Sequence, residues 1–491
     1  MTSLVPRPPY TDDELRRLYP SRLELQLVQV LMRHGERTPV SARFQNTGLS
    51  PWWPYCSDAR QLRSAVLAAG RHSFDALEWK RHLETFGDND QPVLARGPAL
   101  QADTVCDMGS LTDLGRRSTY DLGLRLRQLY VDRLGFLPPS ITSTDSLYLR
   151  ATPVPRALES LHQAFSALYP PSARDPGPDG KFHAPTIVTR VPGDETLYPN
   201  DGNCRRFAAL SRAFAQRAAD RWNATPDMEY LQKLYGKWMP PDTKVAVDSR
   251  PRLSGIADTV NATLAHGPET RLPREFYDAK GMEIMEKISV EEWFAGFNES
   301  REYRMLGMGA LLADVVGRMV GSVEQPPAKN GTGVRFGLSG CHDTTLAGVL
   351  ASLGAYNTDR WPPFTSHLAI ELFKEPKPLA PPKTSSGGSW WSSIFGGALA
   401  TSIGRRPTAD LTPAEKSKMD GYYVRIRYNE EPITVPACRL PGNHLEGDES
   451  FCTLTAFKSV VDKFTPTNWK QQCRTNRGQP ALPAEPEWAG H

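Results

Sequence analysis

The sequence contains no long hydrophobic run. No stretch of about 18 consecutive apolar residues occurs in its 491 residues, so no transmembrane helix is predicted. It also has almost no excess of charge, because 58 basic residues are balanced by 55 acidic ones and the formal net charge is +3. A dedicated nucleic-acid-binding protein carries a basic stripe. The charge balance therefore argues against nucleic acid as a partner.

The first twenty residues lack the features of a targeting segment. They contain no apolar core after a basic start, which a secretory signal peptide requires. They also contain Asp12, Asp13 and Glu14, whereas transit peptides are poor in acidic residues. This segment favours an intracellular location, in the cytosol or the mitochondrion, over secretion.

The seven cysteines show no metal-binding spacing, since no C-x-x-C pair occurs among them. Reduced thiols in a reducing compartment are one interpretation. Cys438 and Cys452, however, bracket a loop that contains Pro and Gly, and they would close it as a disulfide in an oxidising compartment. Spacing alone leaves both interpretations open.

Apolar patterning predicts strands that alternate with helices. Strands are predicted at 23–31, 145–149 and 334–339, and a hairpin at 368–373 and 422–428. Helices are predicted at 62–83, 116–130, 156–169, 301–320 and 344–353, with a mostly helical, Pro-broken region at 170–300. This alternation indicates an α/β sheet, in which ligands gather at the carboxyl ends of strands.

Proline is abundant, and the 43 prolines are nearly twice the usual ~5%. Six of them lie in 374–421, where Pro-rich and Ser/Gly-rich pieces surround an apolar island at 390–404. Such flanks cannot build a packed core, so the segment is predicted to be mobile. The island either folds back on the domain or makes a peripheral membrane contact. The polar, Pro-rich tail at 474–491 is predicted to be disordered.

Three polar clusters directly follow predicted strands. The clusters are Arg33-His34-Gly35-Glu36-Arg37-Thr38-Pro39, then Arg150 with Arg156, then Gly340-Cys341-His342-Asp343. Guanidinium groups match the oxygens of a phosphate two at a time. A neutral imidazole has a free lone pair and can attack phosphorus. Together the clusters predict an anionic, tetrahedral ligand, a histidine nucleophile and a carboxyl that supplies a proton.

The same residues resemble a known family. The segment RHGERTP at 33–39 is similar to the R-H-G-x-R-x-P signature of the histidine acid phosphatases, and His342-Asp343 resembles the His-Asp pair of that family. Arg156, six residues after Arg150, resembles its second-motif arginine, and LTDLG at 111–115 resembles its L-T-x-x-G. These motifs occur in the family's order over 23–473.

The resemblance implies a role for each matching position. His34 would attack phosphorus and form a phosphohistidine, while Asp343 would protonate the leaving alcohol and then assist water. The phosphoryl oxygens would be held by Arg33, Arg37, Arg156 and His342. No metal and no cofactor would be needed, because the arginines and histidines supply the positive field. Glu36 would take no chemical role and would pair with an arginine.

The resemblance also implies the architecture. The expected fold is α/β, with a Rossmann-like mixed sheet flanked by helices and a smaller, mainly helical cap lobe inserted after the second motif. Cys341 is expected to be a buried free thiol. A disulfide that closes the C-terminal loop is common in the family, which favours a Cys438–Cys452 pair. The expected parts are an N-terminal extension at 1–22, a core at 23–169, 301–373 and 422–473, a 45–104 insertion over the site, and the cap at 170–300.

Several functions compete. An acid phosphatase acting on phosphate monoesters agrees best with the motifs, against a mutase-like relative, a phytase and a silent phosphate-binding module. Ser41 stands where bacterial phytases often have a lysine, and although Arg43 lies nearby this slightly disfavours inositol polyphosphates. Aromatic residues in the insertion and the apolar island suit a lipid-like monoester, and the resemblance extends to the lysophosphatidic-acid branch. The aromatic residues of the insertion are Trp52, Trp53 and Tyr55. The oligomeric state stays open.

Overall fold

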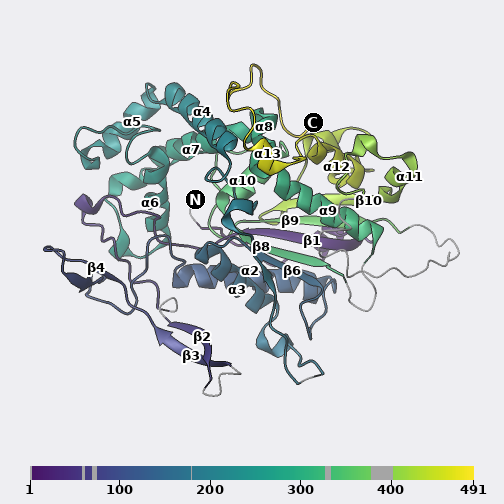
Figure 1. Cartoon of the computed structure of the whole chain (residues 1–491), viewed down its shortest axis with the longest axis horizontal. Coiled ribbons are helices and arrows are strands. Elements are labelled where there is room, and N and C mark those ends of the chain that lie inside the picture. The colour runs from purple at the N-terminus through teal and green to yellow at the C-terminus, as the bar shows by residue number, and fades with distance from the viewer. Residues whose placement is uncertain (1–2, 58–60, 69–73, 179, 327–332, 377–401) are drawn as a thin grey trace.

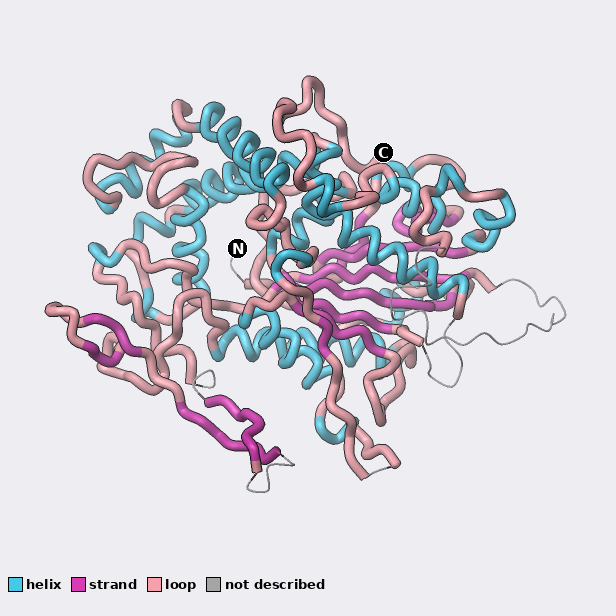
Figure 2. The backbone as a smooth tube through the Cα atoms, viewed as in Figure 1, coloured by secondary structure: helices cyan, strands magenta, loops and turns pink. Residues whose placement is uncertain are grey.

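The structure is a computed structural model of the whole chain (Figure 1). It describes residues 3–57, 61–68, 74–178, 180–326, 333–376 and 402–491. A mixed β-sheet lies at the centre with helices on both of its faces, and a helical lobe lies beside it (Figures 1 and 2). This arrangement confirms the predicted fold class.

In the described residues the central sheet has nine strands, in the order β12-β13-β10-β9-β1-β8-β6-β7, with β11 paired to β10. The strands β1, β8, β6 and β7 are parallel, and antiparallel pairing begins between β1 and β9. The predicted hairpin is the antiparallel pair β9 and β10. The strand bounds are β1 (Glu24–Arg33), β6 (Leu147–Ala151), β7 (Ile187–Val188), β8 (Phe336–Cys341), β9 (His367–Lys374), β10 (Tyr422–Tyr428), β11 (Glu431–Ile433), β12 (His444–Leu445) and β13 (Asp448–Thr453).

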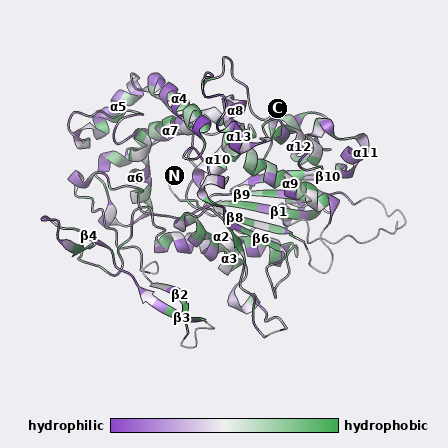
Figure 3. Cartoon of the chain, in the orientation of Figure 1, coloured by the Kyte–Doolittle hydropathy of each residue, from purple (hydrophilic) through white to green (hydrophobic). Residues whose placement is uncertain are grey.

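Strand β1 explains why helices cover both faces of the sheet. Its side chains alternate in direction, as in any strand. Leu27 and Leu31 belong to one hydrophobic core, and Val28, Val30 and Met32 belong to another. Because both faces are apolar, each one requires a layer of helices to exclude water. Figure 3 shows the apolar residues concentrated along these central strands.

Two sets of helices supply those layers. Helices α2 and α3 pack against each other and against the Val28 face, while α9, α10 and α12 contribute to the Leu27 core. Thr112 caps α2 by accepting from the Gly115 amide, which defines where that helix begins. The core helices are α1 (Asp12–Leu18), α2 (Asp113–Arg127), α3 (Pro155–Leu168), α8 (Arg301–Arg304), α9 (Ala310–Glu324), α10 (Asp343–Ser352), α11 (Pro413–Lys416), α12 (Leu454–Asp462) and α13 (Trp469–Gln472).

The lobe beside the sheet is built on a third hydrophobic core. Phe44 and Trp53, which lie before and inside the 45–104 segment, pack in that core with residues of the lobe. Its helices are α4 (Arg205–Trp222), α5 (Pro226–Tyr235), α6 (Leu253–Ala265) and α7 (Ala279–Glu299).

The described residues of 62–83 are not helical, in contrast with the prediction. It contains an antiparallel pair of strands, β2 (Gln61–Leu67) and β3 (Phe74–Lys80), and 84–94 adds β4 (Glu84–Phe86) and β5 (Pro92–Leu94). All side chains of β3 are exposed. Without a buried face to impose a helix, the local preference of aromatic and β-branched residues for strands decides the structure.

The insertion also differs from its expected place over the site. No described residue of 45–104 lines either of the two cavities at the site. Instead Trp53 is 1% exposed in the core of the lobe, and the Tyr55 hydroxyl donates to Glu269 at 2.7 Å. The strands β2 to β5 extend away from the body (Figure 1).

The segment 374–421 was expected to be mobile, and the tail at 474–491 was expected to be disordered. Residues 377–401, which include most of the 390–404 island, lie outside the described residues, but Ile403 is buried and Arg405 forms an ion pair with Asp314 at 2.6 Å. The tail after Cys473 packs on the body, in contrast with the expected disorder. The amides of Glu487 and Ala489 donate to the last carbonyls of α7, which have no partner within that helix.

Three disulfides link the described cysteines: Cys56–Cys106, Cys204–Cys473 and Cys438–Cys452. The third pair confirms the pairing that the resemblance implied. Cys341 is buried and free, as predicted.

One stretch of the described chain, Arg301–Glu324, would be long and apolar enough to cross a membrane. Of its most apolar window, 67% is buried inside the protein. The stretch therefore has the packing of a core helix, and it contains the helix predicted at 301–320.

Candidate active site

The three polar clusters meet at one edge of the sheet. Strands β1, β8 and β6 are parallel neighbours, and Arg33 is in register with Cys341, as Ala151 is with Gly340. The His34 amide donates to the Cys341 carbonyl at 3.1 Å. Since the carboxyl ends of parallel strands coincide, residues 300 positions apart in sequence lie side by side.

A close backbone contact fixes the turn after β1. A Cβ added at Gly35 would lie 2.2 Å from the Gly115 carbonyl oxygen, and a Cβ at Gly115 would lie 2.2 Å from the Glu36 carbonyl oxygen. Only glycine allows this approach. The LTDLG segment at 111–115 therefore supports the turn that carries His34.

His34 is 1% exposed and lies at the centre of the cluster. Its Nδ1 is 2.9 Å from the Gly35 carbonyl oxygen, so Nδ1 carries the hydrogen in this arrangement and Nε2 keeps its lone pair. Burial, together with the positive charges of Arg156 and Arg33, lowers the pKa of His34 well below its ordinary value. The imidazole is therefore neutral at acid pH, as a nucleophile must be.

Arginine side chains surround this imidazole. Burial and the neighbouring Arg37 lower the pKa of Arg156 to about 10, so Arg156 stays charged at acid and neutral pH. The Nε atoms of Arg33, Arg37 and Arg156 are buried without a hydrogen-bond partner. Unpartnered buried donors are costly, and phosphoryl oxygens would satisfy them.

His342 lies beside His34 at the same edge of the sheet. Its ring centroid is 5.6 Å from that of His34, and its Nε2 lies 3.1 Å from the Thr152 hydroxyl. Burial and the charge of Arg156 lower the pKa of His342 to about 3, so this ring is also neutral. A neutral imidazole can donate one hydrogen bond to a phosphoryl oxygen without adding charge.

Asp343, the first residue of α10, is held by three donors. It accepts from Arg33 at 2.8 Å, from the Trp361 indole at 3.0 Å and from the Thr344 amide at 2.8 Å. Burial opposes ionisation of this carboxyl, but Arg33 and Trp361 outweigh it and hold the pKa at about 2. With these partners Asp343 is ionised.

A residue without any sequence motif also belongs to this site. Asp258, on the lobe helix α6, accepts from Arg37 at 2.8 Å, from Arg43 at 3.1 Å and from the Val40 amide at 3.1 Å. It fixes Arg37 and joins the lobe to the loop after β1. Nothing in the Pro-broken 170–300 sequence identifies it, because its role arises only from packing of the lobe on the sheet.

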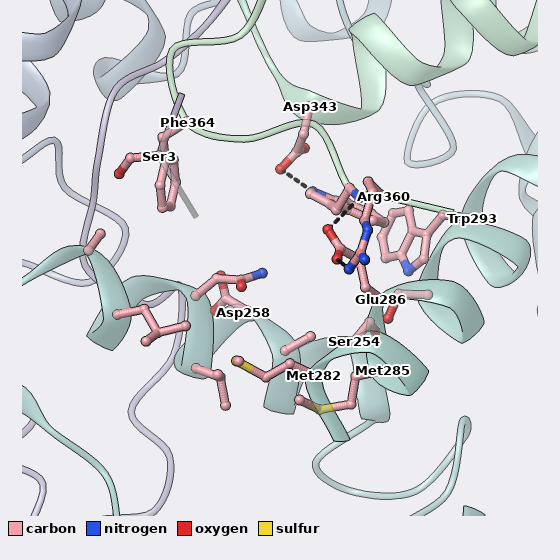
Figure 4. A pocket seen from close by; sticks show the side chains of 18 of the residues that line it. Ser3, Ser254, Asp258, Met282, Met285, Glu286, Trp293, Asp343, Arg360 and Phe364 are labelled. Atoms are coloured by element: carbon pink, nitrogen blue, oxygen red, sulfur yellow. Dashed lines mark hydrogen bonds and ion pairs between the residues drawn. The ribbon is translucent and has the colours of Figure 1, made fainter. Parts of the chain in front are cut away.

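Two cavities open at the cluster. The first, of about 940 Å³, is lined by Arg33, Arg37 and Asp343 on one side and by α6 and α7 on the other (Figure 4). The second, of about 450 Å³, is lined by Arg156 and His342. Trp293 and Thr344 line both cavities, so the two are neighbours.

Two residues of the predicted clusters lie elsewhere. Arg150 is 1% exposed and pairs with Glu195 at 2.5 Å, so it is a structural residue. Glu36 accepts from the Ser118 hydroxyl at 2.5 Å rather than from an arginine. In the described part of the chain no three His, Cys, Asp or Glu residues are grouped as metal ligands.

Comparison with known proteins identifies the family. Residues 24–429 match the model of the histidine phosphatase superfamily, branch 2. The chain belongs to this superfamily. It is 36% identical over 459 residues to a probable acid phosphatase of Schizosaccharomyces pombe, covering 93% of this chain and 95% of that protein. It is 25% identical over 361 residues to lysophosphatidic acid phosphatase type 6 of Bos taurus, covering 72% of this chain and 74% of that protein.

Solved structures agree on the fold of this family. A Hafnia alvei phytase in complex with tartrate has a TM-score of 0.53 at 12% identity, over 92% of this chain and 99% of the other. A multiple inositol polyphosphate phosphatase of Bifidobacterium longum has a TM-score of 0.53 at 13% identity, over 94% and 97%. At such identities the likeness concerns the architecture alone.

Proposed function

We propose that this protein is an acid phosphatase that hydrolyses phosphate monoesters through a phosphohistidine on His34. The observation that carries the proposal is a buried, neutral His34 whose Nε2 is free and which lies among arginines, one of which, Arg33, pairs with the Asp343 carboxyl. Similarity to a probable acid phosphatase over nearly the whole chain supports the same activity.

In the first step Nε2 of His34 attacks phosphorus, and the bond between phosphorus and the ester oxygen breaks. Arg33, Arg37, Arg156 and His342 bind the three non-bridging oxygens and stabilise the charge that they carry in the transition state. The leaving oxygen takes a proton from Asp343. The products are an alcohol and a phosphohistidine.

The proton on Asp343 has to arrive with the substrate, since this carboxyl is ionised when the site is empty. A phosphate group that binds Arg33 competes with Asp343 for the guanidinium and weakens the interaction that holds its pKa low. A monoanionic ester carries one proton on phosphate, which it can transfer to the released carboxylate. The reaction therefore uses the monoanion of the substrate.

In the second step a water molecule attacks the phosphohistidine. The Asp343 carboxylate, left without its proton, accepts one from that water. The bond between Nε2 and phosphorus breaks and the imidazole is restored. Asp343 then returns the proton to the departing inorganic phosphate, so the carboxylate is ionised again. No group other than His34 is modified during the cycle.

The finer part of the proposal is a substrate with an apolar tail, such as a lysophospholipid monoester. Every arginine that lines the first cavity has a carboxylate partner: Arg33 with Asp343, Arg37 and Arg43 with Asp258, Arg360 with Glu286. Further phosphates of an inositol polyphosphate would compete with those partners. The rest of the wall is largely apolar and includes Val40, Leu264, Met282, Met285, Trp361 and Phe364.

The activity is tested with p-nitrophenyl phosphate in the presence of a chelator. Wild-type protein should hydrolyse it between acid and neutral pH, and His34→Ala should abolish turnover. His82→Ala is a matched control, because His82 pairs with the exposed Asp103 outside both cavities. A wild-type protein that binds phosphate but does not turn over would instead favour the silent binding module.

The substrate class is tested by measuring two candidate substrates in separate assays. Lysophosphatidate should give a kcat/KM at least tenfold above that of inositol hexakisphosphate, measured as phosphate release under identical conditions. The reverse order would favour the phytase alternative.

A further inference from the structure

The second cavity contains polar groups that the proposed chemistry does not use. Arg156 and His342, which bind phosphate in the proposed mechanism, line one part of it. Helix α7 of the lobe lines another part with Trp293 and with Glu292, which the mechanism does not use. Trp293 also lines the first cavity, where it contacts Trp361 edge-on with ring centroids 6.1 Å apart. The Trp361 indole donates to Asp343. A substrate that starts at Asp343 can therefore extend past Trp293 into the second cavity.

Glu292 is the unusual group in this cavity. Its side chain is 2% exposed, and its Oε1 accepts from Arg252 at 2.5 Å. Its Oε2 is buried and has no hydrogen-bond partner. Leaving a buried carboxylate oxygen without a partner is costly, so its position at the wall of an open cavity indicates a ligand group that satisfies it.

A second orphan group lies on the same helix. Ser289 is one turn before Glu292 on α7, lines the first cavity, and has a buried Oγ without a hydrogen-bond partner. Residues three apart lie on the same face of a helix. One face of α7 thus carries buried, unsatisfied polar atoms on residues that line the two cavities.

The charges around the second cavity restrict the chemistry of that ligand group. Arg156, Arg212 and Arg252 would repel a cation, whereas Asp201 and Glu292 would repel an anion. Burial raises the pKa of Glu292 to about 7 although Arg252 opposes the shift, so both protonation states occur near neutral pH. A neutral hydroxyl suits either state, because it donates to a carboxylate and accepts from a carboxylic acid.

We propose that the second cavity is a subsite for a hydroxyl-bearing, polyol part of the leaving group, with Glu292 as its hydrogen-bond partner. This inference rests on the proposed phosphatase activity. Together with the apolar wall of the first cavity, it defines a substrate that has both an apolar segment and free hydroxyl groups. Glu292 acts on substrate selection and takes no part in phosphoryl transfer.

The test compares two substrates that differ by two hydroxyl groups, glycerol 3-phosphate and propyl phosphate. Wild-type protein should prefer glycerol 3-phosphate by about tenfold in kcat/KM. Glu292→Ala should raise KM for glycerol 3-phosphate about tenfold and change the constants for propyl phosphate less than twofold. Glu292→Gln keeps a donor and an acceptor, so it should restore most of the loss.

Glu291→Gln is the matched control. Glu291 is the next residue on α7, but it pairs with Arg221 and Trp222 and does not line the second cavity. It should leave both substrates unchanged. Equal losses on both substrates in Glu292→Ala would reveal a merely structural role and overturn the inference.

If Glu292→Ala fails to fold, the test rests on the preference of the wild-type protein for glycerol 3-phosphate. Equal kcat/KM values for glycerol 3-phosphate and propyl phosphate would then overturn the inference. Absence of turnover on both substrates and on p-nitrophenyl phosphate would contradict the proposed function instead. The two failures are therefore distinguishable.

Discussion

At the scale of single residues, the ion pair between Asp343 and Arg33 determines when the site is ready to react. Arg33 is buried and the Asp343 side chain is only 14% exposed, so each group stabilises the charge of the other. In the proposed mechanism, a phosphate group that enters takes over Arg33 and leaves Asp343 able to accept a proton. Substrate binding and preparation of the proton donor are thus a single event.

This coupling predicts the pH dependence of the rate. The second ionisation of a phosphate ester has a pKa of about 6, so the reactive monoanion disappears above that pH. His34 stays neutral on the acid side, because its pKa is far below the ordinary value. We expect kcat/KM to be nearly constant from about pH 4 to 6 and to fall about tenfold per pH unit well above 6. A rate that rises between pH 6 and 8 would contradict the monoanion as substrate.

The role of Asp343 predicts a dependence on the leaving group. An alkoxide is a poor leaving group and requires protonation, whereas p-nitrophenolate leaves without it. Asp343→Asn should lower kcat on alkyl phosphates by roughly 10²–10⁴-fold and affect p-nitrophenyl phosphate far less. Equal losses on both substrates in steady-state assays would remove the proton-donor role.

Sequence motifs predicted the residues at the strand ends, because a short turn that must hold phosphate allows few residue types. Asp258 and Glu292 could not be predicted from the sequence. Each is one carboxylate among many in 170–300, and its environment exists only after the lobe has packed against the sheet. The unusual property of such residues is burial, which a sequence does not display.

At the scale of elements, the packing of α2 against α3 depends on one glycine. A Cβ added at Gly123 of α2 would lie 2.2 Å from the Ala164 carbonyl oxygen of α3. Gly123→Ala should therefore lower the free energy of unfolding by about 1–3 kcal/mol in urea titrations.

Gly321 of α9 provides the control, because a Cβ there would meet nothing within 4 Å. Gly321→Ala should raise the free energy of unfolding by roughly 0.5–1 kcal/mol, since alanine favours the helix. Equal effects of the two substitutions would contradict the packing of α2 on α3.

Elements buried against the sheet were predictable, and exposed elements were not. The strand predicted at 23–31 and the helices predicted at 156–169 and 344–353 agree with β1, α3 and α10 to within two residues at every end. Their apolar periodicity is imposed by the core. The hairpin of β2 and β3 has no such constraint, so a helical spacing of apolar residues there was misleading.

At the scale of the whole molecule, three disulfides link the described part of the chain, over separations of 14, 50 and 269 positions. Disulfides of this kind form in an oxidising compartment, which argues against the intracellular location favoured by the first twenty residues. Cys204–Cys473 joins the start of α4 in the lobe to the end of the sheet domain. It therefore limits how far the lobe can separate from the site when the protein unfolds.

The lengths of the closed loops predict how much two of these disulfides stabilise the fold. Cys204–Cys473 spans 269 positions and Cys438–Cys452 spans 14. In the chain-entropy description, the longer loop contributes about 2.6 kcal/mol more to the free energy of unfolding. Replacing both members of each pair with serine should reproduce that difference in urea titrations. A larger loss from the short-loop variant would contradict it.

Strand β1 is synthesised long before the two strands that pair with it. Both neighbours of β1 in the sheet, β8 and β9, begin at Phe336 or later, about 300 residues after β1 ends. At about 5–20 residues per second, the ribosome needs roughly 15–60 s to deliver them. During that time the strand that carries His34 exposes two apolar faces and two unpaired edges, so the nascent chain depends on protection from aggregation.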